Sequence, residues 1–261
     1  MNENITSNRT AMLWLSLPIA VAMIIGAAIA GKTVETIKTP KRSIEVKGYA
    51  ERKIISDIAT WEVSVSTSAP ALADAYEKLS RDMEAVSKYL SENGIKKEEI
   101  NIFPVQTNTV YLKNEKGIST NKIEKYTMDS RMKITSKDVQ LISRLSGASA
   151  SLIKKGIEFS SSYPQYYYTK LDDIKIEILG EATKNARMRA AQIAGNSGAE
   201  IGPVVWARQG VLQITAPYSM DISDSGQYDT SSIEKFVKSV VTIEYFAVDK
   251  QSSKNSKANQ E

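Results

Sequence analysis

The chain contains no cysteine and no histidine among its 261 residues. These two absences exclude thiol nucleophiles, Ser-His and Cys-His catalytic pairs, zinc sites built on those ligands, and a histidine pH switch. Any metal would have to be a hard cation held by oxygen, and we expect no cofactor. The lack of cysteine gives no information on the compartment, because a chain without thiols suits the cytosol, the periplasm and the cell surface equally.

Sequence motifs for nucleotide binding and for serine hydrolysis are also missing. Neither a Walker-type run nor GxGxxG follows a predicted strand, and there is no G-x-S-x-G nucleophile elbow. The 34 basic and 30 acidic residues are interspersed, and no basic stripe with aromatics between its charges is present. We therefore expect neither nucleic-acid binding nor enzymatic activity.

A long uncharged segment near the N-terminus lies between Arg9 and Lys32 and reads TAMLWLSLPIAVAMIIGAAIAG. As a helix it is long enough to cross the hydrocarbon core of a bilayer. We predict an N-terminal tail over residues 1–10, a transmembrane anchor over 11–31 and a linker over 32–42. A signal peptide cleaved after Ala30 is the alternative, and the length of the segment favours the anchor.

Small residues recur every four positions within this segment, at Ala22, Gly26 and Ala30. They would line one face of the helix, an arrangement that lets membrane helices approach closely and associate. The flanking charges give a different signal, because four basic residues follow the segment and only Arg9 precedes it. Taken alone, the positive-inside rule would leave the following domain in the cytoplasm.

Residues 43–248 alternate between strand and helix patterns and predict an α+β domain of antiparallel or mixed sheets covered by helices. Strands are expected at 44–50, 59–68, 100–112, 126–134, 157–161, 204–214 and 233–248. Helices are expected from a first turn at Pro70 to a stop at Asn93-Gly94, from a cap at Ser136 to near Gly156, and from about Leu171 to Ser197. The polar segment before residue 233 is predicted to be a mobile loop and residues 249–261 a disordered tail.

Two features of the sequence are candidate functional sites. The cluster Tyr163-Pro-Gln-Tyr166-Tyr167-Tyr168 could stack on a sugar or a peptide, but packing on the sheet or an oligomer contact is favoured. The adjacent Asp172 and Asp173 do not share a helix face, so a helix-capping role is favoured over metal or proton chemistry. Trp61, Met128 and Met132 are expected in the core.

Several short motifs are similar in order and spacing to the SIMPL domain family. They are Ile44-Glu-Val-Lys-Gly48-Tyr-Ala-Glu, Ser56-Asp-Ile-Ala-Thr-Trp61, the helix end at Leu90-Ser-Glu-Asn-Gly94, Lys155-Gly156-Ile157, and a helix with alanines at 182, 186, 190 and 194. Physically, the glycines serve backbone geometry and the alanines allow close packing of the helix on the sheet.

This resemblance implies an exported or membrane-anchored bacterial envelope protein with a tendency to form ring-like oligomers and links to envelope or oxidative stress. It supplies no catalytic residues. We therefore expect a single-pass protein of the inner membrane, with its main domain in the periplasm, that is non-catalytic and forms homo-oligomers. The alternative is an extracytoplasmic module that binds a small ligand or peptide through the tyrosine cluster.

Overall fold

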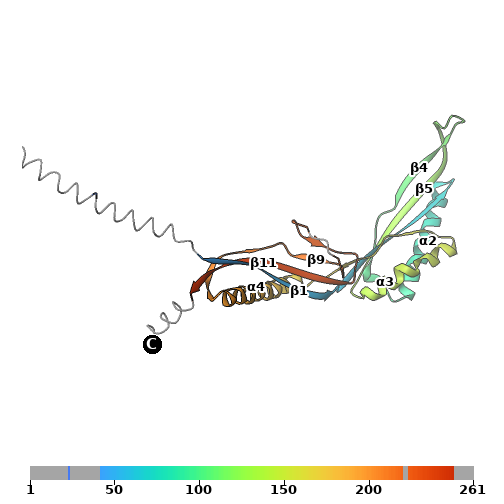
Figure 1. The fold of residues 1–261 in the computed structure, drawn as a ribbon. Helices are drawn as coiled ribbons and strands as arrows, with labels where there is room; N and C mark the ends of the chain where they lie inside the picture. Colours follow the sequence, from blue (N-terminus) through green and yellow to red (C-terminus); the bar gives the residue numbers. More distant parts are fainter. Residues whose placement is uncertain (1–22, 24–41, 220–222, 250–261) are drawn as a thin grey trace, which may run out of the picture. The chain divides into compact units, whose positions relative to one another are not determined.

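The structure, a computed structural model, describes Met23, residues 42–219 and residues 223–249. Within these residues it contains a six-stranded sheet, a five-stranded sheet and three α-helices (Figure 1). The predicted mixed α+β class is therefore confirmed. The helices are α2 (Leu72–Glu92), α3 (Val139–Ala148) and α4 (Leu171–Asn196).

The predicted transmembrane segment, with Ala22, Gly26 and Ala30, lies outside the described residues apart from Met23, and so does most of the predicted tail. Across residues 42–219 and 223–249, no helix combines the length and the apolar character needed to cross a membrane.

The chain divides into two compact units. The described parts of the first are residues 42–46, 190–206 and 244–249, and the second comprises residues 47–189 and 207–243. The boundaries fall within α4 and within three strands, β1 (Ser43–Ile55), β8 (Ala199–Gln209) and β11 (Glu234–Asp249).

The six-stranded sheet lies entirely in the second unit, and all its pairings are antiparallel. Its strand order is β3-β5-β2-β6, with β4 also beside β5 and β7 also beside β2. Its central pair runs in register from Ala59 opposite Ser136 to Ala69 opposite Tyr126. The strands are β2 (Ile58–Ala69), β3 (Ile100–Ile102), β4 (Gln106–Lys113), β5 (Ser119–Ser136), β6 (Glu158–Ser161) and β7 (Gln165–Tyr167).

One face of this sheet forms the main hydrophobic core. Successive side chains of a strand point to opposite faces, so Trp61, Val63 and Val65 of β2 are buried while Glu62 between them is exposed. Helices α2 and α3 contact this face of β2, and α2 also contacts β5. They contribute the buried side chains Leu79, Val86, Leu90, Ile142 and Leu145. As predicted, Trp61, Met128 and Met132 lie in the core, and the indole of Trp61 donates to Ser161 Oγ at 2.8 Å.

The start of α3 differs from the prediction of a Ser136 cap. The helix begins at Val139, and the carboxylate of Asp138 accepts a hydrogen bond from the backbone N–H of Leu141 at 2.8 Å. Ser136 is still the last residue of β5, too far upstream to cap, and its hydroxyl accepts from the N–H of Asp138 instead. After α3 a 3-10 helix, Ser149–Lys155, continues to Gly156, which takes the left-handed conformation with φ 83°.

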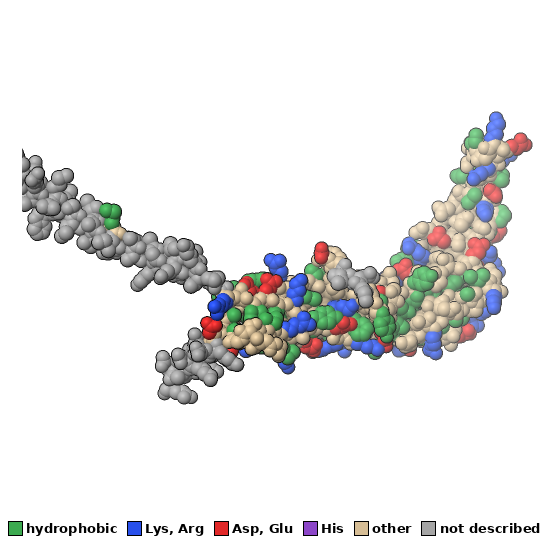
Figure 2. All heavy atoms as spheres, in the orientation of Figure 1, with side chains coloured by type: hydrophobic (Ala, Val, Ile, Leu, Met, Phe, Trp, Pro, Cys, Tyr) green, Lys and Arg blue, Asp and Glu red, His purple; other side chains and the backbone are tan. Residues whose placement is uncertain are grey.

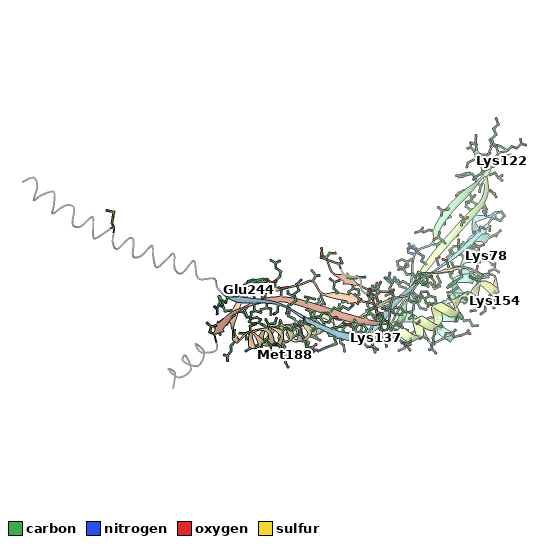
Figure 3. The ribbon with its side chains drawn as sticks, viewed as in Figure 1. Lys78, Lys122, Lys137, Lys154, Met188 and Glu244 are labelled. Carbon is green, nitrogen blue, oxygen red and sulfur yellow. The ribbon has the colours of Figure 1, made fainter. Side chains whose placement is uncertain are left out.

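Strands β4 and β5 form a hairpin that extends beyond α2 and α3 (Figure 1). Its turn is closed by the side chain of Asn114, which accepts hydrogen bonds from the N–H groups of Lys116 and Ile118. Lys122 projects near the end of this hairpin (Figure 3). The predicted hairpin is therefore present, although β3 and β4 are separate strands where one was expected.

The five-stranded sheet has the order β1-β11-β9-β10, and β8 also pairs with β11. The short strands β9 (Gln213–Thr215) and β10 (Gln227–Tyr228) are parallel to each other. Helix α4 approaches β1 closely at Gly48, where a Cβ atom would lie 2.1 Å from the carbonyl oxygen of Ala182. Only glycine fits at such a distance, and the predicted small-residue face of α4 is confirmed because Ala182 and Ala186 are fully buried.

Candidate functional site

The tyrosines singled out in the sequence do not share one surface. Strand β7 pairs with the start of β2, with Tyr166 opposite Ala59 and Tyr167 opposite Ile58. Tyr166 is buried in the core at 6% exposure, whereas Tyr163 is 95% exposed. Tyr167 and Tyr168 are half-buried. The four side chains therefore do not form a single stacking platform.

Tyr167 instead pairs with Tyr228 of β10, a residue that sequence reasoning did not select. Their ring centroids lie 6.3 Å apart with 31° between the ring planes, within the range of favourable aromatic pairs. The backbone N–H of Tyr168 donates to the Tyr228 hydroxyl at 3.2 Å, and the Tyr167 hydroxyl donates to Gln165 Oε1 at 2.6 Å. The segment predicted to be a mobile loop thus contains the short strand β10, and its Tyr228 packs on β7.

The residue after Tyr228 begins a densely hydrogen-bonded polar cluster, which we call the Asp229 cluster and define as Asp229, Ser231, Ser232 and Lys235. One carboxylate oxygen of Asp229 accepts from the N–H of Ser231 at 3.0 Å and from its hydroxyl at 2.7 Å. The other accepts from the N–H of Ser232 at 3.3 Å, from its hydroxyl, and from the Lys235 ammonium at 3.2 Å. This turn encloses the carboxylate within its own segment.

The charge state of Asp229 follows from these contacts. Burial by itself raises the pKa of a carboxyl group, because it disfavours the ionised form. Here the hydrogen bonds from Ser231 and Ser232 and the charge of Lys235 outweigh burial and hold the pKa of Asp229 well below its ordinary value. Asp229 is therefore an ionised, acceptor-only group and does not act as an acid near neutral pH.

Lys235 is unusual because its side chain is completely buried at 0% exposure, while that of Asp229 is 11% exposed. Its ammonium also donates to the carbonyl oxygen of Ser232 at 2.5 Å. Burial lowers the pKa of Lys235, and the neighbouring carboxylate opposes that shift. A buried ammonium is rare in proteins unless it is paired, so this pair is an integral part of the fold.

The Asp229 cluster lies where three separate segments of the second unit are joined by backbone hydrogen bonds. The N–H of Tyr166 donates to the carbonyl of Thr230 at 2.8 Å, and the N–H of Ser56 donates to that of Ile233 at 2.9 Å. Beside them, the carboxylate of Asp57 accepts from the N–H and the hydroxyl of Thr169, at 2.9 and 2.7 Å. Backbone hydrogen bonds from residues beside the cluster therefore join the β1–β2 turn, β7 and the segment that leads into β11.

The other candidate residues, Asp172 and Asp173, do not form a common site in the structure. Asp172 accepts a hydrogen bond from Lys175 at 2.8 Å, which lowers the pKa of Asp172, and both aspartates lie in the first turn of α4. Within the described ranges no group of three or more acidic residues could hold a metal ion. A pocket of about 560 Å³ beside the start of α3 is lined by both charge signs, with Lys96 and Lys137 near Glu99 and Asp138.

Strand β8 carries an exposed apolar run. Val204, Val205 and Trp206 are 52%, 40% and 37% exposed, and Pro203 and Ala207 on either side are also exposed. Elsewhere basic and acidic side chains are interspersed over the visible face, as the composition predicted (Figure 2). A run of consecutive exposed apolar residues is unusual on a soluble surface and indicates a contact with another molecule.

Comparison with known families identifies one match. The family model SIMPL, described as a protein of unknown function (DUF541), matches residues 44–245. No curated protein matches the chain.

Proposed function

Because the chain belongs to the SIMPL family, whose matched region covers nearly all the described residues, we propose that it is a non-catalytic, membrane-anchored envelope protein that self-assembles. The observation that carries self-assembly is the exposed run Val204–Trp206 on β8. An edge strand with consecutive apolar side chains exposed to water is a template for association with another chain.

Membrane anchoring rests on the sequence. The uncharged segment over 11–31 has the length of a membrane-spanning helix. We place the main domain in the periplasm, on the outer side of the cytoplasmic membrane, because the motifs of the family outweigh a charge bias of a few residues. A role in the envelope or oxidative stress response is part of the same proposal.

The absence of catalysis rests on the character of the polar groups. The best-formed polar cluster is buried, its carboxylate is saturated with donors, and its ammonium is fully covered. Such groups stabilise a fold, whereas a catalytic acid or base must reach a substrate atom.

Cell fractionation tests anchoring and sidedness. The full chain is expected to stay in the membrane pellet after extraction with alkaline carbonate, and protease added to spheroplasts is expected to degrade the main domain. Release by carbonate, or protection from protease until the membrane is lysed, would contradict the proposal. For assembly, a variant lacking residues 43–248 but keeping the anchor is expected to lose the multimer, and a multimer formed by the anchor alone would show that the domain is not responsible.

A module that binds a small ligand is the second candidate, and the pocket beside α3 is the observation that favours it. The tyrosine cluster no longer supports this candidate, because Tyr166 is buried and Tyr167 packs on Tyr228. Thermal-shift screening of the full chain with small charged metabolites tests it. A ligand whose effect disappears in Lys96→Ala and Lys137→Ala would establish this function.

A further inference from the structure

Strand β8 is exposed on both of its faces. From Pro203 to Gln209 every residue is exposed, although successive side chains of a strand point to opposite faces. Among the described strands β8 pairs with β11 only, so its other edge is open. An open edge combined with an apolar run is the arrangement that native proteins normally avoid unless another strand covers it.

We propose that this edge pairs with β8 of a second copy of the chain, antiparallel and with the two-fold axis at Val204. The proposal rests on the self-assembly proposed above and names the surface through which two copies meet. A contact between identical surfaces must be self-complementary, because each residue meets a counterpart across the axis. The sequence of β8, AEIGPVVWARQ, has this property about its Val204 centre.

Charge complementarity fixes the register of the two strands. With the axis at Val204, Glu200 of one copy lies opposite Arg208 of the other, and this pair occurs twice. Both side chains are exposed, and neither has an ion pair within residues 42–219 and 223–249. Moving the axis by one residue places Glu200 opposite Trp206 or Gly210, so both charge pairs are lost.

The apolar residues also match in this register. Gly202 lies opposite Trp206 of the second copy, and Val204 lies opposite its own counterpart. An aromatic ring across from a glycine covers backbone that the glycine leaves open, and branched side chains form favourable cross-strand pairs. The register thus covers the exposed apolar run with the same run of the other copy.

Pro203 determines which backbone groups face the partner, and it leaves the carbonyl of Val205 in each copy without a ladder donor. The Glu200–Arg208 pairs and the apolar contacts must therefore supply the stability of the pairing. Proline has no N–H to donate, and within sheets it lies where that side faces the open edge. The backbone polar groups of Pro203 and Val205 then face the open edge. The N–H and C=O groups of Val204 face β11. Val204 and its counterpart form a non-hydrogen-bonded pair, in which Cα atoms are about 4.5 Å apart.

The lack of cysteine in the chain allows a direct test of this geometry by cross-linking. Val204→Cys introduces one thiol whose counterpart lies within the distance of a disulfide. We expect the full-length variant in mild detergent to form a covalent dimer under mild oxidation. Glu200→Cys is the matched control in the same strand, because the two copies of residue 200 would be about 27 Å apart in this register. Glu200→Cys alone is expected to stay monomeric on a non-reducing gel, while an equal mixture of Glu200→Cys and Arg208→Cys is expected to cross-link.

Charge reversal gives an independent measurement that does not depend on thiol chemistry. E200R and R208E are each expected to raise the dissociation constant of the dimer about 2- to 30-fold, the range for the loss of two cross-strand charge pairs. The double variant E200R/R208E is expected to restore it. A double variant as weak as the single ones would overturn the proposal.

The outcomes separate this interface from self-assembly as such. A multimer without the Val204→Cys cross-link shows that the chain assembles through another surface, which overturns the inference and leaves the proposed function standing. Equal cross-linking of Val204→Cys and Glu200→Cys overturns the register. Cross-links only to other proteins would assign β8 to a different partner, and a monomer throughout would contradict both proposals.

Discussion

The ammonium of Lys235 lies 3.2 Å from a carboxylate oxygen of Asp229, in a site where the lysine side chain is completely buried. The two residues are six positions apart, and the turn between them supplies the other donors to the carboxylate. Removing a buried charge from water is costly, so each partner depends on the other and on Ser231 and Ser232.

Replacing Asp229 is expected to destabilise the fold more than replacing Lys235. Asp229→Asn leaves the Lys235 charge buried without its counter-charge and should lower the free energy of unfolding by about 3–5 kcal/mol. Lys235→Met should cost less, because Asp229 keeps its donors from Ser231 and Ser232. Chemical denaturation measures both. The control is Lys53→Met, which removes a half-exposed ion pair with Glu234 and should change stability by less than about 1 kcal/mol. An Asp229→Asn variant no less stable than this control would contradict a structural role for the pair.

Acid should weaken the protein through the same carboxylate. The folded-state pKa of Asp229 lies below its unfolded value of about 3.9, so its contribution to stability is complete above that pH and is lost as the pH falls toward the folded pKa. Urea denaturation between about pH 5 and pH 2 should therefore give a steeper loss of stability for the wild type than for Asp229→Asn. Identical slopes would show that Asp229 has similar pKa values in both states.

Replacing a buried tyrosine should destabilise the protein more than replacing an exposed one. Tyr166→Ala removes a core side chain of 6% exposure and should lower the free energy of unfolding by about 3–5 kcal/mol, as for other large core aromatics. Tyr163→Ala, at 95% exposure, should change it by less than about 0.5 kcal/mol. Denaturation followed by tryptophan fluorescence measures both. Equal effects would mean that Tyr166 does not pack as described.

Two glycines give a matched test of the contact between α4 and β1. Gly48→Ala places a methyl group 2.1 Å from the Ala182 carbonyl, so backbone must move, and a loss of about 1–3 kcal/mol is expected. Gly180→Ala within α4 meets nothing within 4 Å and should instead stabilise the helix by about 1 kcal/mol. A neutral Gly48→Ala would show that α4 is not held against β1 at this distance.

Regular elements could be predicted from the sequence because their patterns repeat. The alternation around Trp61 and the alanine spacing of α4 both identified the buried face, and both are confirmed. For α2 the sequence pattern was less accurate in identifying which residues face the sheet. The apolar residues that step by three or four along this segment include Tyr76, which would place it on the buried face, but Tyr76 is 57% exposed. Ala75 is buried in its place, because a small residue suits a helix that packs closely on a sheet.

The Asp229 cluster could not be predicted in the same way. It lies in a short polar segment with no period, and the hydrogen bonds depend on a turn that only the folded chain forms. One signal was present in the sequence. Lys235 shares the inward face of β11 with Val237 and Val241, so the alternation of the predicted strand placed a lysine at a core position. A buried lysine then requires a carboxylate nearby, and Asp229 is such a residue.

Self-assembly of the full chain is tested by its native mass. Light scattering after size exclusion in mild detergent, corrected for bound detergent, compares the protein with the 28.8 kDa of one chain. We expect a discrete multiple of that mass that persists on dilution through the micromolar range. A mass of 28.8 kDa at every concentration would show that the protein is a monomer and does not self-assemble.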